Sequence, residues 1–157
     1  MHHVIQEYVA QQLPLKQEMK EQVIELLRGI VWYIHKQRPI KAQVFKPYVE
    51  YIATKTKLEN ENKALLYNTI ATLNETMGSY DKALEQKQKS VSILEEILTA
   101  NHPELAAIYM SIGNTYRHLA NYNKALFYQK KSLAIREEIL PINHPDLATI
   151  YDNIGNT

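Results

Sequence analysis

Apolar residues in the second half of the chain recur with the spacing of a buried helix face. Between 105 and 119 they fall at positions i, i+3, i+4 and i+7, which gathers them on one side of an α-helix, and a second apolar stripe runs from about 122 to 140. The short turn Ala120-Asn121 separates the two stripes, so the pattern predicts a helical hairpin. The apolar members are Leu105, Ile108, Tyr109, Ile112, Tyr116 and Leu119, then Ala125, Leu126, Tyr128, Leu133, Ile135, Ile139 and Leu140.

This hairpin pattern repeats every 42 residues. Asn101-His102-Pro103 returns as Asn143-His144-Pro145, and 11 of 15 residues are identical between 101–115 and 143–157. A further 14 of 35 are identical between 64–98 and 106–140, so the array over 60–157 divides into 60–100, 101–142 and the first helix of a third unit at 143–157. Each Asn-His-Pro is expected to begin a hairpin, because proline fits the first helical turn and the preceding side chains can cap it.

Small residues recur where the two helices of a hairpin would cross. Ala71, Gly113 and Gly155 occupy one such position, and Ala83 and Ala125 occupy the other. A large side chain there would hold the helix axes apart, so we expect close packing at these points. Gly78-Ser79 stands where Ala120-Asn121 forms the turn of the next unit, and it supplies a residue that tolerates unusual backbone angles.

The repeated residues resemble the tetratricopeptide signature in the 42-residue form of kinesin light chains. The resemblance covers about 60–157 and implies an all-α fold, a right-handed α-solenoid of stacked helical hairpins that binds proteins. Lys87 and Gln129 stand where that family buries an aromatic residue, and Ser90 and Ser132 replace its usual alanine. Looser or more solvated packing of the second helices is expected there. The resemblance is carried by Tyr109, Ile112, Gly113, Tyr116, Tyr122, Ala125 and Leu126.

Residues 1–59 lack the 42-residue period but keep helical spacing. They are interpreted as an irregular helical cap on the first repeat. A second interpretation starts from Met1-His2-His3-Val4-Ile5-Gln6-Glu7 and 45–51, which resemble the winged-helix end and linker of signal-transduction NTPases with tetratricopeptide arrays. In that family a histidine of this segment senses the phosphate of the bound nucleotide, a role that the resemblance would give to His2. The chain has no Gly-x-x-x-x-Gly-Lys-Ser/Thr loop to hold a nucleotide. The chain would then be the downstream sensor part.

Charge and composition narrow the classes of partner. Lys and Arg number 18 against 17 for Asp and Glu, so a net charge of +1 gives no field that would attract nucleic acid or an anionic membrane. The most apolar stretch, 23–34, is too short to span a bilayer. Cysteine is absent and no targeting signal is visible, so we expect a cytoplasmic location.

Candidate catalytic and metal-binding groups are few. His102 and His144 recur beside helix-starting prolines, which favours a structural role, and Glu95-Glu96 recurs as Glu137-Glu138, as helix-face residues do. No Gly-x-Ser-x-Gly, His-Glu-x-x-His or cysteine nucleophile occurs. The sequence therefore predicts no enzyme activity, no cofactor and no metal.

The surface created by stacking is the remaining candidate site. First helices of stacked hairpins line the concave wall of such an array, so their inward side chains would form a groove for a protein or peptide ligand. Asn114 and Asn156 are the favoured contacts, because an amide both donates and accepts. The alternative is that Gly-Asn-Thr merely repeats by duplication and faces water. The candidates, from helical geometry and the family resemblance, are Asn68, Thr72, Glu75, Met110, Asn114, Arg117, His118, Asp152 and Asn156.

Three functions fit such a groove. The first is the sensor or partner-recruiting array of a larger multidomain signalling protein. The others are a cargo adaptor like kinesin light chain and the regulatory tail of an enzyme. Proline at 14, 39 and 47 opposes the continuous coiled coil expected before a cargo adaptor's repeats. Separately, Leu147, Ile150, Tyr151 and Ile154 form an apolar stripe without a hairpin partner, which predicts fraying or self-association there.

Overall fold

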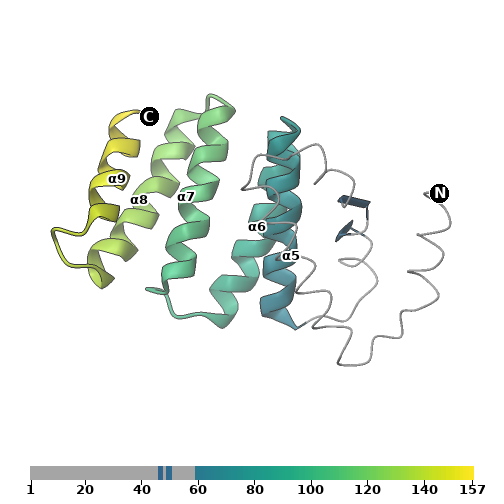
Figure 1. Cartoon of the computed structure of the whole chain (residues 1–157), viewed down its shortest axis with the longest axis horizontal. Helices are drawn as coiled ribbons and strands as arrows, with labels where there is room; N and C mark the ends of the chain where they lie inside the picture. Colours follow the sequence, from purple (N-terminus) through teal and green to yellow (C-terminus); the bar gives the residue numbers. More distant parts are fainter. Residues whose placement is uncertain (1–45, 48, 51–58) are drawn as a thin grey trace.

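The structure is a computed structural model that describes residues 46, 47, 49, 50 and 59–157. The array consists of α5 (Asn60–Thr76), α6 (Tyr80–Ile97), α7 (Pro103–His118), α8 (Tyr122–Ile139) and α9 (Pro145–Gly155). The helices follow one another in chain order along the long axis of the molecule (Figure 1). Residues 46, 47, 49 and 50 are also helical, and the described residues contain no strand. The other helices expected within 1–59 lie outside the described residues.

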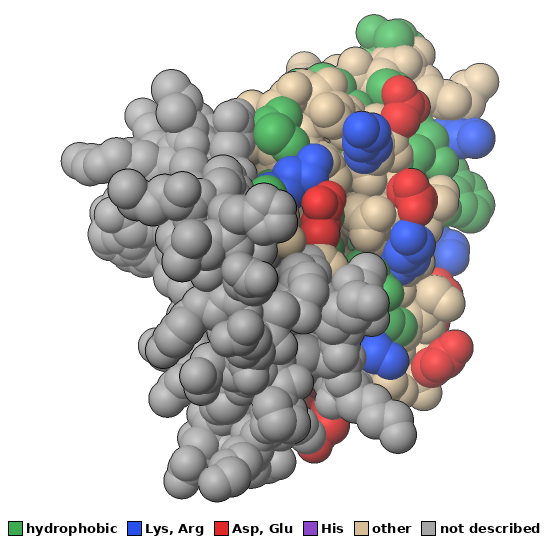
Figure 2. All heavy atoms as spheres, turned by 90° about the vertical axis from the view of Figure 1, so that its right-hand side faces the viewer, with side chains coloured by type: hydrophobic (Ala, Val, Ile, Leu, Met, Phe, Trp, Pro, Cys, Tyr) green, Lys and Arg blue, Asp and Glu red, His purple; other side chains and the backbone are tan. Residues whose placement is uncertain are grey.

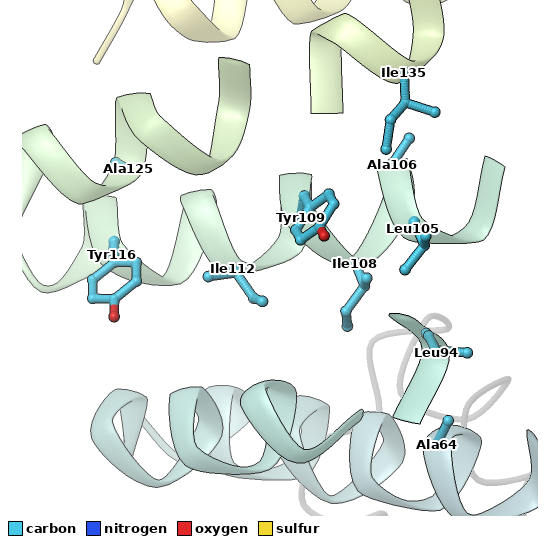
Figure 3. Close-up of a cluster of buried hydrophobic side chains, with 10 residues drawn as sticks. All are labelled: Ala64, Leu94, Leu105, Ala106, Ile108, Tyr109, Ile112, Tyr116, Ala125 and Ile135. Atoms are coloured by element: carbon cyan, nitrogen blue, oxygen red, sulfur yellow. The ribbon is translucent and has the colours of Figure 1, made fainter. Parts of the chain in front are cut away.

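The helices pack as two hairpins and the first helix of a third. α5 packs on α6 and α7 packs on α8, while α6 with α7 and α8 with α9 join successive units. Leu105, Ile108, Ile112 and Tyr116 lie along α7 in the apolar core, with Ala125 of α8 opposite (Figure 3). The i, i+3, i+4, i+7 stripe is thus the buried face of α7, and the expected all-α hairpin repeat is confirmed.

The histidine of each Asn-His-Pro sequence caps the N-terminus of the helix that follows. Nδ1 of His102 accepts a hydrogen bond from the backbone N–H of Glu104 at 3.2 Å, and Nδ1 of His144 accepts one from the N–H of Asp146 at 3.2 Å. Pro103 and Pro145 are the first residues of α7 and α9, as the sequence predicts.

The hairpin turns use left-handed backbone angles at equivalent positions. Gly78 has φ +69° and Ala120 has φ +55°. Glycine reaches this region without a Cβ clash, whereas alanine is strained there. The turn of the second unit is therefore formed at a backbone cost that the first unit avoids.

Gly113 lets the two helices of the second hairpin approach closely. A Cβ added to it would lie 2.8 Å from Cγ of Gln129 and 3.1 Å from the carbonyl oxygen of Ala125. Both are closer than ordinary van der Waals contacts, so the small residue is needed here. Gly155 shares the register of Gly113, but a Cβ there would meet nothing within 4 Å.

The expectation of looser packing at the polar positions of the second helices is wrong. Lys87 and Gln129 are only 1% and 0% exposed. Ser90 donates to the carbonyl oxygen of Ala64 at 2.8 Å, and Ser132 donates to that of Ala106 at 2.7 Å. Each serine thus tethers the second helix to the first of its hairpin, because a helical carbonyl keeps a lone pair for a side-chain donor.

Tyrosine and glutamate link successive units at equivalent positions. The hydroxyl of Tyr109 on α7 donates to the Glu95 carboxylate at the end of α6, and the hydroxyl of Tyr151 on α9 donates to Glu137 of α8. The first acid of each Glu-Glu pair therefore joins one unit to the next, a role that helix periodicity alone does not indicate. Burial, followed by the hydrogen bond to Glu95, raises the pKa of Tyr109 above its usual value.

The last helix is partly covered. Leu147 and Ile150 are each 4% exposed, and α9 packs on α8. The structure thus differs from the expectation of an uncovered apolar stripe at these two residues, since both are buried in the array. Tyr151 remains 52% exposed.

Candidate functional site

Four of the nine candidate groove residues line one hollow between α5 and α7. Thr72 and Glu75 come from α5, and Asn114 and His118 come from α7. The hollow has a volume of about 360 Å³, which is within the range of small-ligand sites. Its remaining lining residues are Thr76, Tyr80, Lys87 and Ser111.

A buried lysine forms part of the wall. Nζ of Lys87 on α6 donates to Glu75 Oε1 at 2.6 Å, to Thr115 Oγ1 at 2.7 Å and to the carbonyl oxygen of Ser111 at 3.1 Å. The Thr115 hydroxyl lies 2.6 Å from the same Glu75 oxygen. An ammonium has three donors, so these contacts use all of them. Lys87 thereby connects both helices of the first hairpin to the first helix of the second.

Burial and charge act in opposite directions on this lysine. Burial lowers the pKa of Lys87, and the charge of Glu75 with its hydrogen bond offsets part of that shift. The side chain of Glu75 is 25% exposed, so one end of the ion pair reaches solvent in the hollow while the other is enclosed.

The Asn114 side chain carries an unused acceptor. Its Oδ1 is buried and accepts no hydrogen bond within the described part of the chain. A buried acceptor without a partner raises the free energy of the folded state. A donor brought by a ligand would remove that cost.

An aromatic pair borders the same hollow. The rings of Tyr80 and His118 are stacked, with centroids 4.8 Å apart and planes 7° from parallel. Tyr80 begins α6 and His118 ends α7, so the stack joins the two units at the edge of the hollow.

The groove continues toward the N-terminal ends of α5 and α7. A hollow of about 110 Å³ lies between them, lined by Ala64, Leu65, Asn68, Ser90, Leu94, Glu104, Ala107, Ile108 and Ser111. A further hollow of about 330 Å³ lies where Glu61 and Glu104 stand in the first turns of these helices. Asn68 is thus the fifth candidate that the structure brings to the groove.

The other four candidates line none of these three hollows. Met110 and Arg117 are half-buried on α7, whereas Asp152 on α9 and Asn156, which follows its last residue, are exposed. Asn156 holds the register of Asn114, 42 residues on.

Sequence reasoning missed Lys87 and Tyr80 as groove residues. A signal for Lys87 was present, because Ala83, Lys87, Ser90 and Leu94 follow the spacing of a buried helix face. A lysine on such a face requires a partner, and the acid that supplies it, Glu75, lies in the preceding helix.

Charge elsewhere on the surface is mixed. Figure 2 shows basic and acidic side chains interspersed over the described residues on one face, without a large area of one sign. Within the described ranges, no helix has the length and apolar character needed to cross a membrane. Among the same residues, no three acidic, histidine or cysteine side chains are grouped as metal ligands would be.

Residues 62–138, which cover nearly all of α5 to α8, match the tetratricopeptide repeat family. The solved structures that share the fold include the nearly identical TPR-like repeats of a candidate kinesin light chain from Podosopora anserina, at 16% identity and a TM-score of 0.74 over 87% of this chain and 65% of that one. BtubC (BKLC) from P. vanneervenii matches at 18% identity and a TM-score of 0.77 over 95% of this chain and 59% of that one.

A third solved structure, PcrH in complex with the chaperone binding region of PopB, matches at 12% identity and a TM-score of 0.59 over 91% of this chain and 97% of that one. At these identities the likeness shows the fold alone. The chain spans less than two thirds of the candidate kinesin light chain repeats and of BtubC. No curated protein matches the sequence.

Proposed function

We propose that this chain binds a segment of another protein in the groove between α5 and α7. Tetratricopeptide repeats form protein-binding scaffolds, and the match to that family covers nearly all of α5 to α8. The observation that carries the proposal is the alignment of three hollows along one pair of first helices, with Asn68, Thr72, Glu75, Asn114 and His118 among their lining. The role is one of binding, and no catalytic step is proposed.

The chemistry of the groove suits a polypeptide. Asn68, Thr72 and Asn114 offer polar groups to a backbone, and Leu65 with Ala107 offers apolar contact between them. PcrH, which has a similar fold, was solved with the chaperone binding region of PopB. That complex supports the idea that a short array of this fold can hold a polypeptide.

The wider setting that we propose is the partner-recruiting array of a larger multidomain signalling protein in the cytoplasm, with residues 1–59 capping the first repeat. Nζ of Lys46 donates to Asn74 Oδ1 of α5 at 2.6 Å, and Val49 is fully buried, which supports the cap.

Self-association is a secondary proposal, which rests on the exposed Tyr151 and on Ile142, 90% exposed. Light scattering that shows a monomer at every concentration would remove it.

The proposed groove is tested with the Asn68→Ala, Asn114→Ala double variant, because both side chains line the hollows between α5 and α7. Binders are first selected for the wild-type chain from an array of random peptides. The variant should bind them more weakly by about 1–3 kcal/mol, since each lost hydrogen bond contributes about 0.5–1.5 kcal/mol. Its thermal midpoint should stay nearly unchanged, because both side chains line open hollows and Oδ1 of Asn114 accepts no hydrogen bond within the described residues.

Asn123→Ala is the matched control, because Asn123 is exposed on the second helix α8, outside the groove. It should bind the same peptides as the wild type does. A double variant that unfolds several degrees lower yet binds normally would show that the asparagines are structural. Failure of the wild type to bind any peptide of the array would overturn the proposed function itself.

A further inference from the structure

The hollow between α5 and α7 contains a lysine but offers no positive charge to a ligand. Each donor of the Lys87 ammonium is already used, by Glu75, Thr115 and the Ser111 carbonyl. The ammonium is also fully enclosed, at 1% exposure. A carboxylate or phosphate entering the hollow would therefore find no free donor on this residue, so Lys87 does not make the hollow an anion site.

The groups that remain available in the hollow include two acceptors. Glu75 uses only Oε1 in hydrogen bonds, while its Oε2 accepts none within the described residues and its side chain is 25% exposed. Oδ1 of Asn114 is buried and has no donor there. Two acceptors without donors are complementary to a group that carries several N–H donors.

The stacked pair at the border of the hollow fits the same kind of group. Tyr80 and His118 present two parallel aromatic planes at its edge. A planar guanidinium can lie against an aromatic ring while its N–H groups point at nearby oxygens. An arginine side chain can therefore donate to both acceptors and also pack against the aromatic rings. A lysine side chain can donate to the acceptors.

Charge along the rest of the groove agrees with this. The acids that line the three hollows are Glu61, Glu75 and Glu104, and Lys87 is the one Lys or Arg in their lining. The Lys87 charge is balanced by Glu75, so Glu61 and Glu104 leave the groove negative in a chain of net charge +1. Glu61 and Glu104 also lie in first helical turns, where the helix dipole stabilises an acid without any ligand. Glu75 is therefore the more specific evidence for a basic ligand.

We propose that the polypeptide bound in this groove is basic, and that an arginine or lysine side chain of it enters the hollow of Glu75, Asn114, Tyr80 and His118. The proposal rests on the proposed function and specifies its ligand. Glu61 and Glu75 are 14 residues apart on α5, about 21 Å at the helical rise. An extended ligand covers that span in about six residues, so a second basic residue at about that spacing would meet the acidic end of the groove.

The test measures charge preference on a random peptide array with the full chain. Wild-type binders should be enriched in arginine and lysine. The Glu75→Gln, Lys87→Met variant removes the acceptor charge without leaving Lys87 unpaired, and it should lose at least about tenfold in affinity for the basic peptides. His118→Ala should lose affinity for arginine-containing binders more than for lysine-containing ones. His118 is exposed, and its substitution removes the stack on Tyr80.

Glu96→Gln is the matched control, because Glu96 is an exposed acid of α6 that does not line the groove. It should keep wild-type affinity, which would show that loss of an acid outside the groove does not weaken binding. Binders that are acidic or show no charge preference would overturn this inference and leave the proposed function standing. An array with no binders at all would overturn both. A circular dichroism spectrum of each variant confirms that it is folded before binding is compared.

Discussion

The buried ion pair between α5 and α6 gives the most specific prediction for stability. Glu75→Gln removes the charge that balances the enclosed Lys87 ammonium, but keeps the size of the side chain. Lys87→Met removes the ammonium and fills its place with an apolar chain. The two changes break the same pair and should have unequal costs, because Lys87 is 1% exposed while the Glu75 side chain is 25% exposed.

The exposures set the expected magnitudes. Loss of one partner of a buried ion pair costs about 3–5 kcal/mol, and partial access to solvent reduces this to about 2–4 kcal/mol for Glu75→Gln. Lys87→Met leaves a carboxylate that solvent and the Thr115 hydroxyl can still satisfy, so about 0–2 kcal/mol is expected. The double variant should cost about as little as Lys87→Met alone, because an apolar replacement of a buried pair is often neutral.

Urea unfolding followed by circular dichroism measures these free energies, with the slopes compared to check that the cooperative unit is unchanged. Lys89→Met is the control, since Lys89 pairs with Glu85 at 2.6 Å but the side chains are 46% and 60% exposed. It should change stability by less than about 1 kcal/mol. Additive single and double effects, or a larger cost for Lys87→Met than for Glu75→Gln, would show that the two residues are not coupled as a buried ion pair.

Four other substitutions test the turns, the helix crossing and the unit junction. Ala120→Gly should be neutral to stabilising by about 1 kcal/mol and Gly78→Ala destabilising by about 1 kcal/mol in thermal unfolding, because both sites have positive φ. Gly113→Ala should cost about 1–3 kcal/mol in urea unfolding, because its methyl group would overlap Gln129. For Tyr109→Phe, the alkaline loss of stability should be smaller than in the wild type. A raised folded pKa stabilises the protein below about pH 10, the unfolded value, and that stabilisation is lost as pH rises toward the folded pKa, as pH-dependent unfolding would show.

The hairpins were predictable from sequence because their signals are local. The apolar stripe, the helix-starting His-Pro and the turn at Gly78 each act within a few residues, and the 42-residue period repeats them. The identity of the first helices, and hence of the groove wall at Asn68 and Thr72, followed from the same pattern.

The contacts between units were not predictable in the same way. The partners of Lys87 come from two other helices, so its burial depends on Glu75 and Thr115 being present at distant positions. The hydrogen bond from Tyr109 to Glu95 likewise joins residues of two different units. From the sequence alone, such side chains differ from the repeat pattern without a visible reason, because their partners lie far away in the chain.

Mapping where a peptide binds tests the proposed groove most directly. A peptide selected on the array is titrated into the ¹⁵N-labelled chain, and the backbone amide shifts are followed by NMR. Binding in the groove should move the amides of Asn68, Thr72, Ser111 and Asn114, whereas those of the exposed Phe127 and Lys131 on α8 should stay in place. Shifts confined to Phe127, Lys131 and their neighbours on α8 would contradict binding in the groove, because the ligand would then lie on the second helices.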